Sequence, residues 1–157
     1  MRATRTRPRP KDGIDYGILT GLLGYRLRRA QAVVFNHFLE SVGAAGISPG
    51  QFGVLVLIKE NSGLSQSALA KALGIERSTM VAVIDRLEGQ GWVERVTSET
   101  DRRSYALRLT SEGTAFLARV TPLVRRHERA IAAGLEAGER RLLIDLLDRL
   151  AAALEGP

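Results

Sequence analysis

The chain has 157 residues, of which 45% are hydrophobic and 25% are charged. This composition is typical of one globular domain with an apolar core, and it excludes a low-complexity chain. The lack of cysteine excludes disulfides, thiolate metal sites and cysteine nucleophiles, and it favours a reducing, cytoplasmic location. The sequence contains neither 18 consecutive apolar residues nor the apolar core of a secretory signal, so we expect no membrane-spanning helix.

The net charge of +6 is concentrated at the N-terminus. Residues 1–11 contain five cations and no acid, which leaves 18 cations against 17 acids in the rest of the chain. A segment rich in arginine and proline cannot bury enough apolar surface to fold alone, so residues 1–12 are predicted to form a basic, flexible arm. Two interpretations of this arm stay open: a solvated tail, or a segment that reaches nucleic-acid phosphates.

The next segment, residues 13–46, is predicted to be a dimerisation helix. Between Asp15 and Val42, apolar residues recur every three or four positions, as they do along one face of a helix. At 1.5 Å per residue such a helix is about 40 Å long, which is more than one small domain can cover. The apolar stripe consists of Leu19, Leu23, Leu27, Ala30, Val34, Phe38 and Val42. We expect a second copy of the chain to cover it, with Leu19 and Leu23 among the dimer contacts.

Residues 47–112 contain a predicted helix-turn-helix unit. A capping box at Ser48 and Gln51 opens one helix, Ser65 can cap the next, and Gly74 stands where a left-handed turn is needed. A further helix runs to about Glu88. In a helix-turn-helix unit the second helix lies in the DNA major groove, although a similar pattern also occurs at the corner of a helical bundle.

The outer face of this unit supplies the first set of predicted DNA contacts. They are Ser65, Gln66, Arg77, Ser78, Thr79, Val81, Ala82 and Arg86. Val81 and Ala82 can touch thymine methyl groups but cannot donate hydrogen bonds, so base reading is expected to depend on the residues at positions 77–79.

A β-hairpin is predicted to follow, with strands in "WVERV" and "YALRLT". The tip between them has no Gly, Pro or Asn, yet it carries Asp101, Arg102 and Arg103. A long tip without turn-forming residues indicates a role other than closing the hairpin, and arginines at the end of a β-ribbon can enter a minor groove. Arg95, Arg102 and Arg103 are therefore predicted DNA contacts. Asp101 is expected to shape the tip by bonding to its backbone or by pairing with Arg95 or Arg103.

Residues 113–157 are predicted to form further dimerisation helices. The last helix has a wide leucine face that needs a partner surface. Its predicted dimer contacts are Leu142, Leu143, Leu146, Leu147 and Leu150. Together with the first helix, this face predicts a homodimer.

The sequence favours neither an enzyme nor a metal or cofactor site. It contains no G-x-G-x-x-G, P-loop, H-E-x-x-H or G-x-S-x-G motif. Its two histidines, His37 and His127, are expected on different helices, without carboxylates spaced to complete a site.

The hairpin carries a recognisable motif. "DRRSYALRLTSEG" fits the pattern D-x-R, three residues, L-x-L-T-x-x-G, and "IDRLEGQGWVERV" precedes it. From about residue 15 onward the chain resembles the MarR family of winged helix-turn-helix regulators. The resemblance implies a mostly α-helical fold with a small β-hairpin wing, in which the N- and C-terminal helices intertwine in an obligate homodimer. It also implies a ligand-responsive repressor that binds a palindromic DNA operator.

By the same resemblance, binding of a small aromatic or phenolic anion, or of its coenzyme A thioester, is expected to release the regulator from the DNA. Candidate effector-binding residues are Tyr25, Arg26, Arg29, His37 and Phe38, each of which can also be an ordinary core or surface residue. A second interpretation is a dimeric adaptor that has kept the fold and lost DNA binding, for which Val81 and Ala82 are the one hint. Effector identity, target genes and the direction of regulation stay open.

Overall fold

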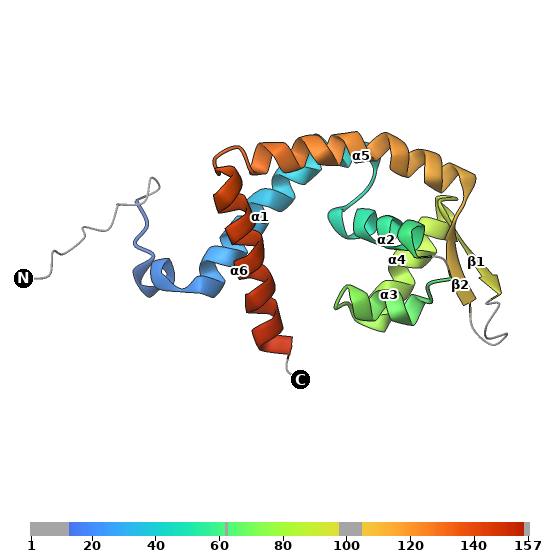
Figure 1. Ribbon diagram of the computed structural model, residues 1–157, viewed down its shortest axis with the longest axis horizontal. Coiled ribbons are helices and arrows are strands. Elements are labelled where there is room, and N and C mark those ends of the chain that lie inside the picture. The colour runs from blue at the N-terminus through green and yellow to red at the C-terminus, as the bar shows by residue number, and fades with distance from the viewer. Residues whose placement is uncertain (1–12, 62, 98–104, 156–157) are drawn as a thin grey trace, which may run out of the picture. The chain divides into compact units, whose positions relative to one another are not determined.

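The computed structural model describes residues 13–61, 63–97 and 105–155. The chain divides into two compact units, Met1–Asn36 and His37–Pro157, and each is considered by itself. Figure 1 shows the mostly helical chain with its single described hairpin. Within the described ranges, no helix has the length and apolar character needed to cross a bilayer.

The first unit begins differently from the sequence-based prediction of one continuous helix. A 3-10 helix, η1 (Gly17–Gly21), comes first, and α1 (Leu23–Ser41) starts after it. Leu22 between them is extended, with φ −86° and ψ 124°. The Asp15 carboxylate accepts a hydrogen bond from the backbone N–H of Gly17, whose φ is +49°. A left-handed glycine and a local side-chain bond compete with the α-helix, so the helix begins later than its apolar periodicity suggests.

The second unit contains the predicted helix-turn-helix and hairpin. Its elements after the end of α1 are η2 (Gly43–Ala45), α2 (Pro49–Glu60), α3 (Gln66–Ala72), α4 (Arg77–Gly89), β1 (Val93–Thr97), β2 (Tyr105–Leu109), α5 (Ser111–Ile131) and α6 (Ala137–Glu155). The predicted capping box at Ser48 is present, and Ser65 and Thr110 cap α3 and α5. Gly74 has a φ of +61°, as the turn between α3 and α4 requires.

The two strands pair in antiparallel register, with Val93 opposite Leu109 and Thr97 opposite Tyr105. A bridge between Ser65 and Ala106, and a hydrogen bond of 2.9 Å from the Leu107 N–H to the Leu64 carbonyl, attach β2 to the segment before α3. The base of the hairpin is therefore part of the helix-turn-helix lobe and not a separate appendage.

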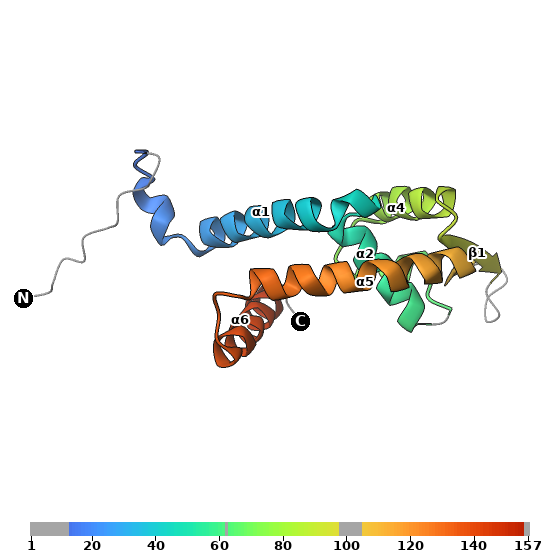
Figure 2. The same ribbon diagram turned by 90° about the horizontal axis from the view of Figure 1, so that it is seen from above.

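One apolar core joins α2, α3, α4, the hairpin and α5. Its fully buried side chains include Leu55, Leu69, Met80, Ile84, Leu87, Leu107 and Val120. In Figures 1 and 2, α2 lies beside α5, and the two helices are in contact. Because α4 contributes three fully buried residues to this core, its opposite face is held outward.

No side chain of α6 between Ala137 and Leu154 is buried among the described residues. Leu142 is 57% exposed, and Leu143, Leu146 and Leu147 are 45%, 46% and 41% exposed. A leucine face of this size is an unusually apolar surface for a single chain in water. The predicted leucine stripe is thus present as an uncovered surface.

Candidate DNA-binding surface

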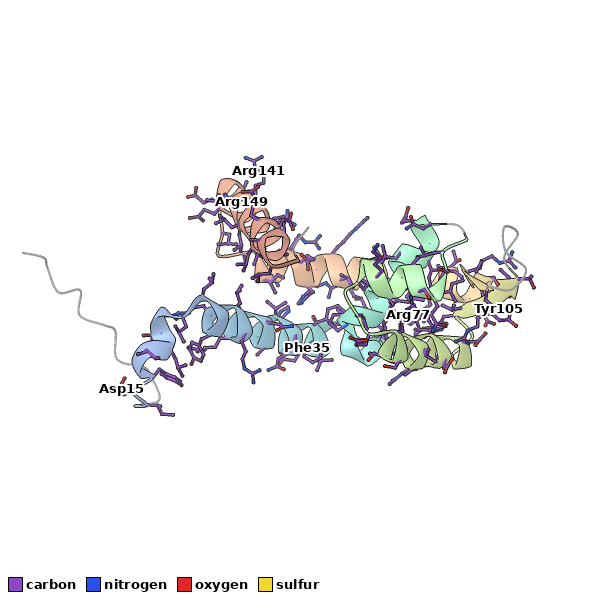
Figure 3. The ribbon with its side chains drawn as sticks, turned by 90° about the horizontal axis from the view of Figure 1, so that it is seen from below. Asp15, Phe35, Arg77, Tyr105, Arg141 and Arg149 are labelled. Carbon is purple, nitrogen blue, oxygen red and sulfur yellow. The ribbon has the colours of Figure 1, made fainter. Side chains whose placement is uncertain are left out.

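Helix α4 divides into a buried and an exposed face. Met80, Ile84 and Leu87 have no exposed surface. The predicted contact residues Arg77, Ser78, Thr79, Val81, Ala82 and Arg86 are all exposed. Figure 3 labels Arg77 at the start of α4. Val81 is 42% exposed, which places an apolar β-branched side chain in the middle of an otherwise mostly polar outer surface.

The two predicted contacts at the start of α3 are half-buried and already have partners. The Ser65 hydroxyl accepts a hydrogen bond of 3.2 Å from the Ala68 N–H and so caps the helix. The Gln66 side-chain oxygen accepts a hydrogen bond of 3.4 Å from Arg95. Both side chains hold the lobe together, and their contact with DNA remains a prediction.

Arg95 on β1 lies in a small ionic cluster. Its guanidinium pairs with Asp85 at 2.5 Å and with Glu88, both on α4. The hydrogen bond to Asp85 raises the pKa of Arg95, and the negative charge of Glu88 raises it further. Burial of the guanidinium lowers the pKa but does not outweigh these two effects. Only 24% of the Arg95 side chain is exposed. The sequence-based interpretation placed this arginine on DNA or beside Asp101, but in the described part of the chain it is engaged by α4.

The base of the hairpin is closed by Thr110 and Gly113. The Thr110 hydroxyl donates to the Gly91 carbonyl at 2.6 Å and accepts from the Gly113 N–H at 2.9 Å, while the Thr110 N–H donates to the Trp92 carbonyl at 3.1 Å. Gly113 packs so closely on the backbone that an added Cβ would lie 1.9 Å from the Trp92 oxygen. These contacts explain the T-x-x-G part of the motif: they join the end of β2 and the start of α5 to the turn after α4.

The hairpin tip itself, with Asp101, Arg102 and Arg103, lies outside the described residues. Tyr105, labelled in Figure 3, is the first residue of β2 after the tip and is 63% exposed. The minor-groove role of the two arginines and the shaping role of Asp101 therefore stay predictions.

The candidate effector residues fall in both units. In the first, the rings of Tyr16 and Tyr25 are 6.1 Å apart, and the Arg29 guanidinium lies 5.9 and 6.0 Å from their centres. Such distances fit cation–π contacts. Arg26 donates from its Nε to the Thr20 carbonyl at 3.0 Å.

In the second unit, His37 and His127 meet with their Nδ1 atoms 2.7 Å apart, and Phe38 packs edge-on against His127. The sequence indicates separate helices for the two histidines but gives no sign of this pairing, because it depends on how the end of α1 packs on α5. Phe38 and His127 are each 3% exposed, so Phe38 lies in the core. Two nitrogens at this distance share one proton in a hydrogen bond, so one ring donates and the other accepts.

This pair predicts a pH-dependent stability. Burial, and then the charge of His37, lower the pKa of His127 from its ordinary value of 6.5, while Glu128 opposes the shift. Between the lowered pKa of His127 in the folded chain and its ordinary value of 6.5, the unfolded chain therefore binds a proton that the folded chain does not, so the free energy of unfolding should fall as the pH decreases through this range. Denaturant unfolding at fixed protein concentration between pH 5 and 8 measures the slope. His127→Gln should flatten it, and equal slopes in both proteins would contradict the assignment.

Comparison with known proteins identifies this architecture. The model of the MarR family matches residues 47–105, which include α2, α3, α4 and β1. A putative transcriptional regulatory protein for the hcr operon of Thauera aromatica is 42% identical over 153 residues, covering 96% of this chain and 92% of the relative. The chain belongs to the MarR family.

Solved structures agree with this MarR assignment. The transcriptional repressor CouR bound to a 23-mer DNA duplex is 43% identical, with a TM-score of 0.83, over 88% of this chain and 98% of CouR. CouR bound to p-coumaroyl-CoA is 42% identical, with a TM-score of 0.82, over 88% of this chain and 97% of CouR. The chain is thus a winged-helix, DNA-binding transcriptional regulator and not an enzyme, as its sequence predicts.

Proposed function

We propose that this MarR-family regulator represses transcription by binding a palindromic operator as a homodimer, and that a small aromatic or phenolic anion, or its coenzyme A thioester, releases it. The observation that carries the proposal is the outward face of α4, which presents Arg77 and neighbouring residues beside a hairpin anchored to the same core. The likeness to CouR, which has been solved with both DNA and p-coumaroyl-CoA, supports both halves of the proposal.

In this proposal α4 enters the major groove. Its positions 77–79 and 86 supply hydrogen-bond donors and cations, and Val81 and Ala82 supply apolar contacts. The hairpin tip, with Arg102 and Arg103, reaches the adjacent minor groove, and Asp101 shapes it. Ser65 and Gln66, at the start of α3, are the remaining proposed DNA contacts.

The dimer supplies the symmetry. Leucines on α6, together with Leu19 and Leu23 at 40% and 61% exposure, offer the apolar surface that a second copy would cover. A two-fold dimer presents two α4 helices to successive turns of one DNA face, so the half-sites should lie about one helical turn apart. We therefore assign dimerisation to residues 13–46 and 113–157 and DNA binding to residues 47–112.

The effector acts by shifting a population. A ligand that binds preferentially to a dimer whose lobes do not fit successive grooves weakens DNA binding by its differential affinity. Tyr25, Arg26 and Arg29 in the first unit, and His37 and Phe38 in the second, are the proposed binding residues. Aromatic rings and arginines suit a ligand that carries both a ring and an anionic group.

The proposal is tested with DNA enriched from a random-sequence library by the wild-type protein. A discrete, salt-sensitive complex on a palindromic duplex, released by p-coumaroyl-CoA or a related aromatic acyl thioester, is the expected result. Free coenzyme A is the control, because it shows whether the phosphates of the thioester release the DNA without the aromatic acyl group. Failure to enrich any sequence at low salt would favour the adaptor over the repressor, whereas binding that no aromatic acid or thioester affects would remove the effector half only.

Val81 provides a sharper test of major-groove reading. If it contacts a thymine methyl group, replacing that thymine by uracil should cost about 0.8 kcal/mol, or about fourfold in affinity, for each methyl group removed from the interface. Val81→Ser should bind the thymine duplex more weakly and discriminate less between thymine and uracil. Fluorescence anisotropy with the two duplexes measures both effects. If replacing thymine by uracil weakens binding equally in the wild type and in Val81→Ser, the methyl group contacts a residue other than Val81.

A further inference from the structure

We propose that Arg95 is a positioning residue for DNA binding: it fixes the hairpin against α3 and α4 and offsets part of the negative charge of two carboxylates beside the DNA-facing surface, without itself contacting DNA. This inference rests on the DNA-binding role described above. It also revises the sequence-based interpretation, in which Arg95 was itself a DNA contact.

The guanidinium of Arg95 joins three elements. From β1 its Nη2 reaches Asp85 at 2.5 Å and Gln66 at 3.4 Å, and its Nη1 pairs with Glu88. Asp85 and Glu88 belong to α4, and Gln66 begins α3. A planar guanidinium holds its donors in a fixed fork, so several partners restrict its position more than one would.

The position of Arg95 in the hairpin extends this restraint to the wing. Arg95 pairs across the sheet with Leu107, which is 2% exposed and packed in the core. From there the same ladder continues through Val96 and Ala106 to Thr97 and Tyr105, the last described residues on either side of the tip. An anchor at Arg95 therefore sets the direction in which the hairpin leaves the lobe.

The two carboxylates need such a partner. Val81, Asp85 and Glu88 are spaced four and three residues apart on α4, so they share one face of the helix. The Asp85 and Glu88 side chains are 57% and 40% exposed. Unpaired negative charges on the surface that meets DNA would repel phosphates, whereas the paired cluster places one cation between them.

The engagement of Arg95 argues against a direct phosphate contact. Its side chain is more sheltered than either carboxylate, and both of its terminal nitrogens have acidic partners. Reaching a phosphate would leave Asp85 and Glu88 without this cation. Separating Arg95 from Asp85 and Glu88 would cost the free energy of two charged hydrogen bonds, which favours a positioning role over a DNA contact.

A double-mutant cycle tests the inference, using the duplex enriched by the wild-type protein. Arg95→Ala should weaken binding by at least about tenfold, with little change in the dependence of affinity on salt. In an Asp85→Asn/Glu88→Gln background the same change should weaken binding less than about threefold, because the negative charges that Arg95 offsets are gone. Arg95→Lys should recover only part of the affinity, since a single ammonium cannot reproduce the fork. Circular dichroism and the melting temperature check folding, and Arg95→Gln replaces any alanine variant that fails to fold.

A direct contact predicts another pattern. Arg95→Ala would then reduce the salt dependence of the affinity by the amount expected for about one lost phosphate contact. It would also weaken binding by the same factor in the wild-type and the Asp85→Asn/Glu88→Gln backgrounds. That result, or an unchanged affinity of Arg95→Ala, would overturn the inference and leave the regulator's function intact. A wild-type protein that enriches no DNA would instead overturn DNA binding, and the inference with it.

Discussion

Gly113→Ala is expected to destabilise the folded protein by about 3 kcal/mol or more, at the upper end of overpacking substitutions. The added Cβ would lie 1.9 Å from the Trp92 carbonyl oxygen, 2.7 Å from its carbon and 2.9 Å from its Cα. All three are backbone atoms, so no side-chain rotation relieves the overlap. The start of α5 must move away from the hairpin instead.

That movement would break a connected set of contacts. The Gly113 N–H bonds the Thr110 hydroxyl at 2.9 Å, and the Thr110 N–H bonds the same Trp92 carbonyl. The Trp92 ring stacks on Phe116 with ring centres 3.6 Å apart. Because these groups hold the base of the hairpin, DNA binding should fall together with stability.

Denaturant unfolding at matched protein concentration measures the loss, with Gly53→Ala as the control. Gly53 lies inside α2, and an added Cβ there meets no atom within 4 Å. Alanine favours the helix over glycine by up to about 1 kcal/mol, so this variant should keep or gain stability. Comparable losses from the two substitutions would show that glycine content, and not the close approach at Trp92, decides the result.

Leu147→Glu is expected to dissociate the proposed dimer and to reduce operator affinity by about a hundredfold or more. Burying one leucine is worth about 1.5–3 kcal/mol, and a two-fold interface contains each leucine twice. The substitution also places a charge among Leu143, Leu150 and Leu154, which share a helix face with position 147. Sedimentation at micromolar concentration and anisotropy on the enriched duplex give the two readouts.

Ala152→Glu is the matched control. It introduces the same side chain into α6, but on the opposite face of the helix. Asp145 and Asp148 share that face, as do Arg141 and Arg149, the two arginines labelled in Figure 3. Its dimer and its operator affinity should match those of the wild type. A Leu147→Glu protein that stays dimeric and binds DNA normally would remove α6 from the interface. A folded wild-type monomer would remove the homodimer itself.

Much of the candidate site could be predicted because it depends on local rules. The caps at Ser48, Ser65 and Thr110, the left-handed turn at Gly74 and the exposed face of α4 each follow from residues within one or two helical turns. The predicted start of the first helix was wrong for a local reason too. The apolar stripe continues through residues 17–22, but the Asp15 bond and the positive φ of Gly17 prevent a regular α-helix there.

The relationships between distant residues needed the fold. Arg95 is ten residues from Asp85 and 29 from Gln66, and His37 is 90 residues from His127. The charge of Arg95 suggests DNA, but the antiparallel register and the packing of α4 on the hairpin give it acidic partners first. Similarly, the sequence shows Gly113 only as part of a motif. The structure gives the reason for a glycine at this position, because the Trp92 carbonyl lies where a Cβ would be.

The amino-acid sequence by itself determined the order of the helices and strands from α2 to α6, the exposed face of α4 and the leucine stripe of α6, and its motif carried the resemblance to a DNA-binding family. Hydrophobic periodicity, capping and turn chemistry act over a few residues, so one chain is enough to read them. Only the tertiary structure decided which charges are engaged, which histidines share a proton and which glycine cannot carry a side chain. Those properties arise from close packing and hydrogen bonding between segments far apart in the chain, which no local pattern records.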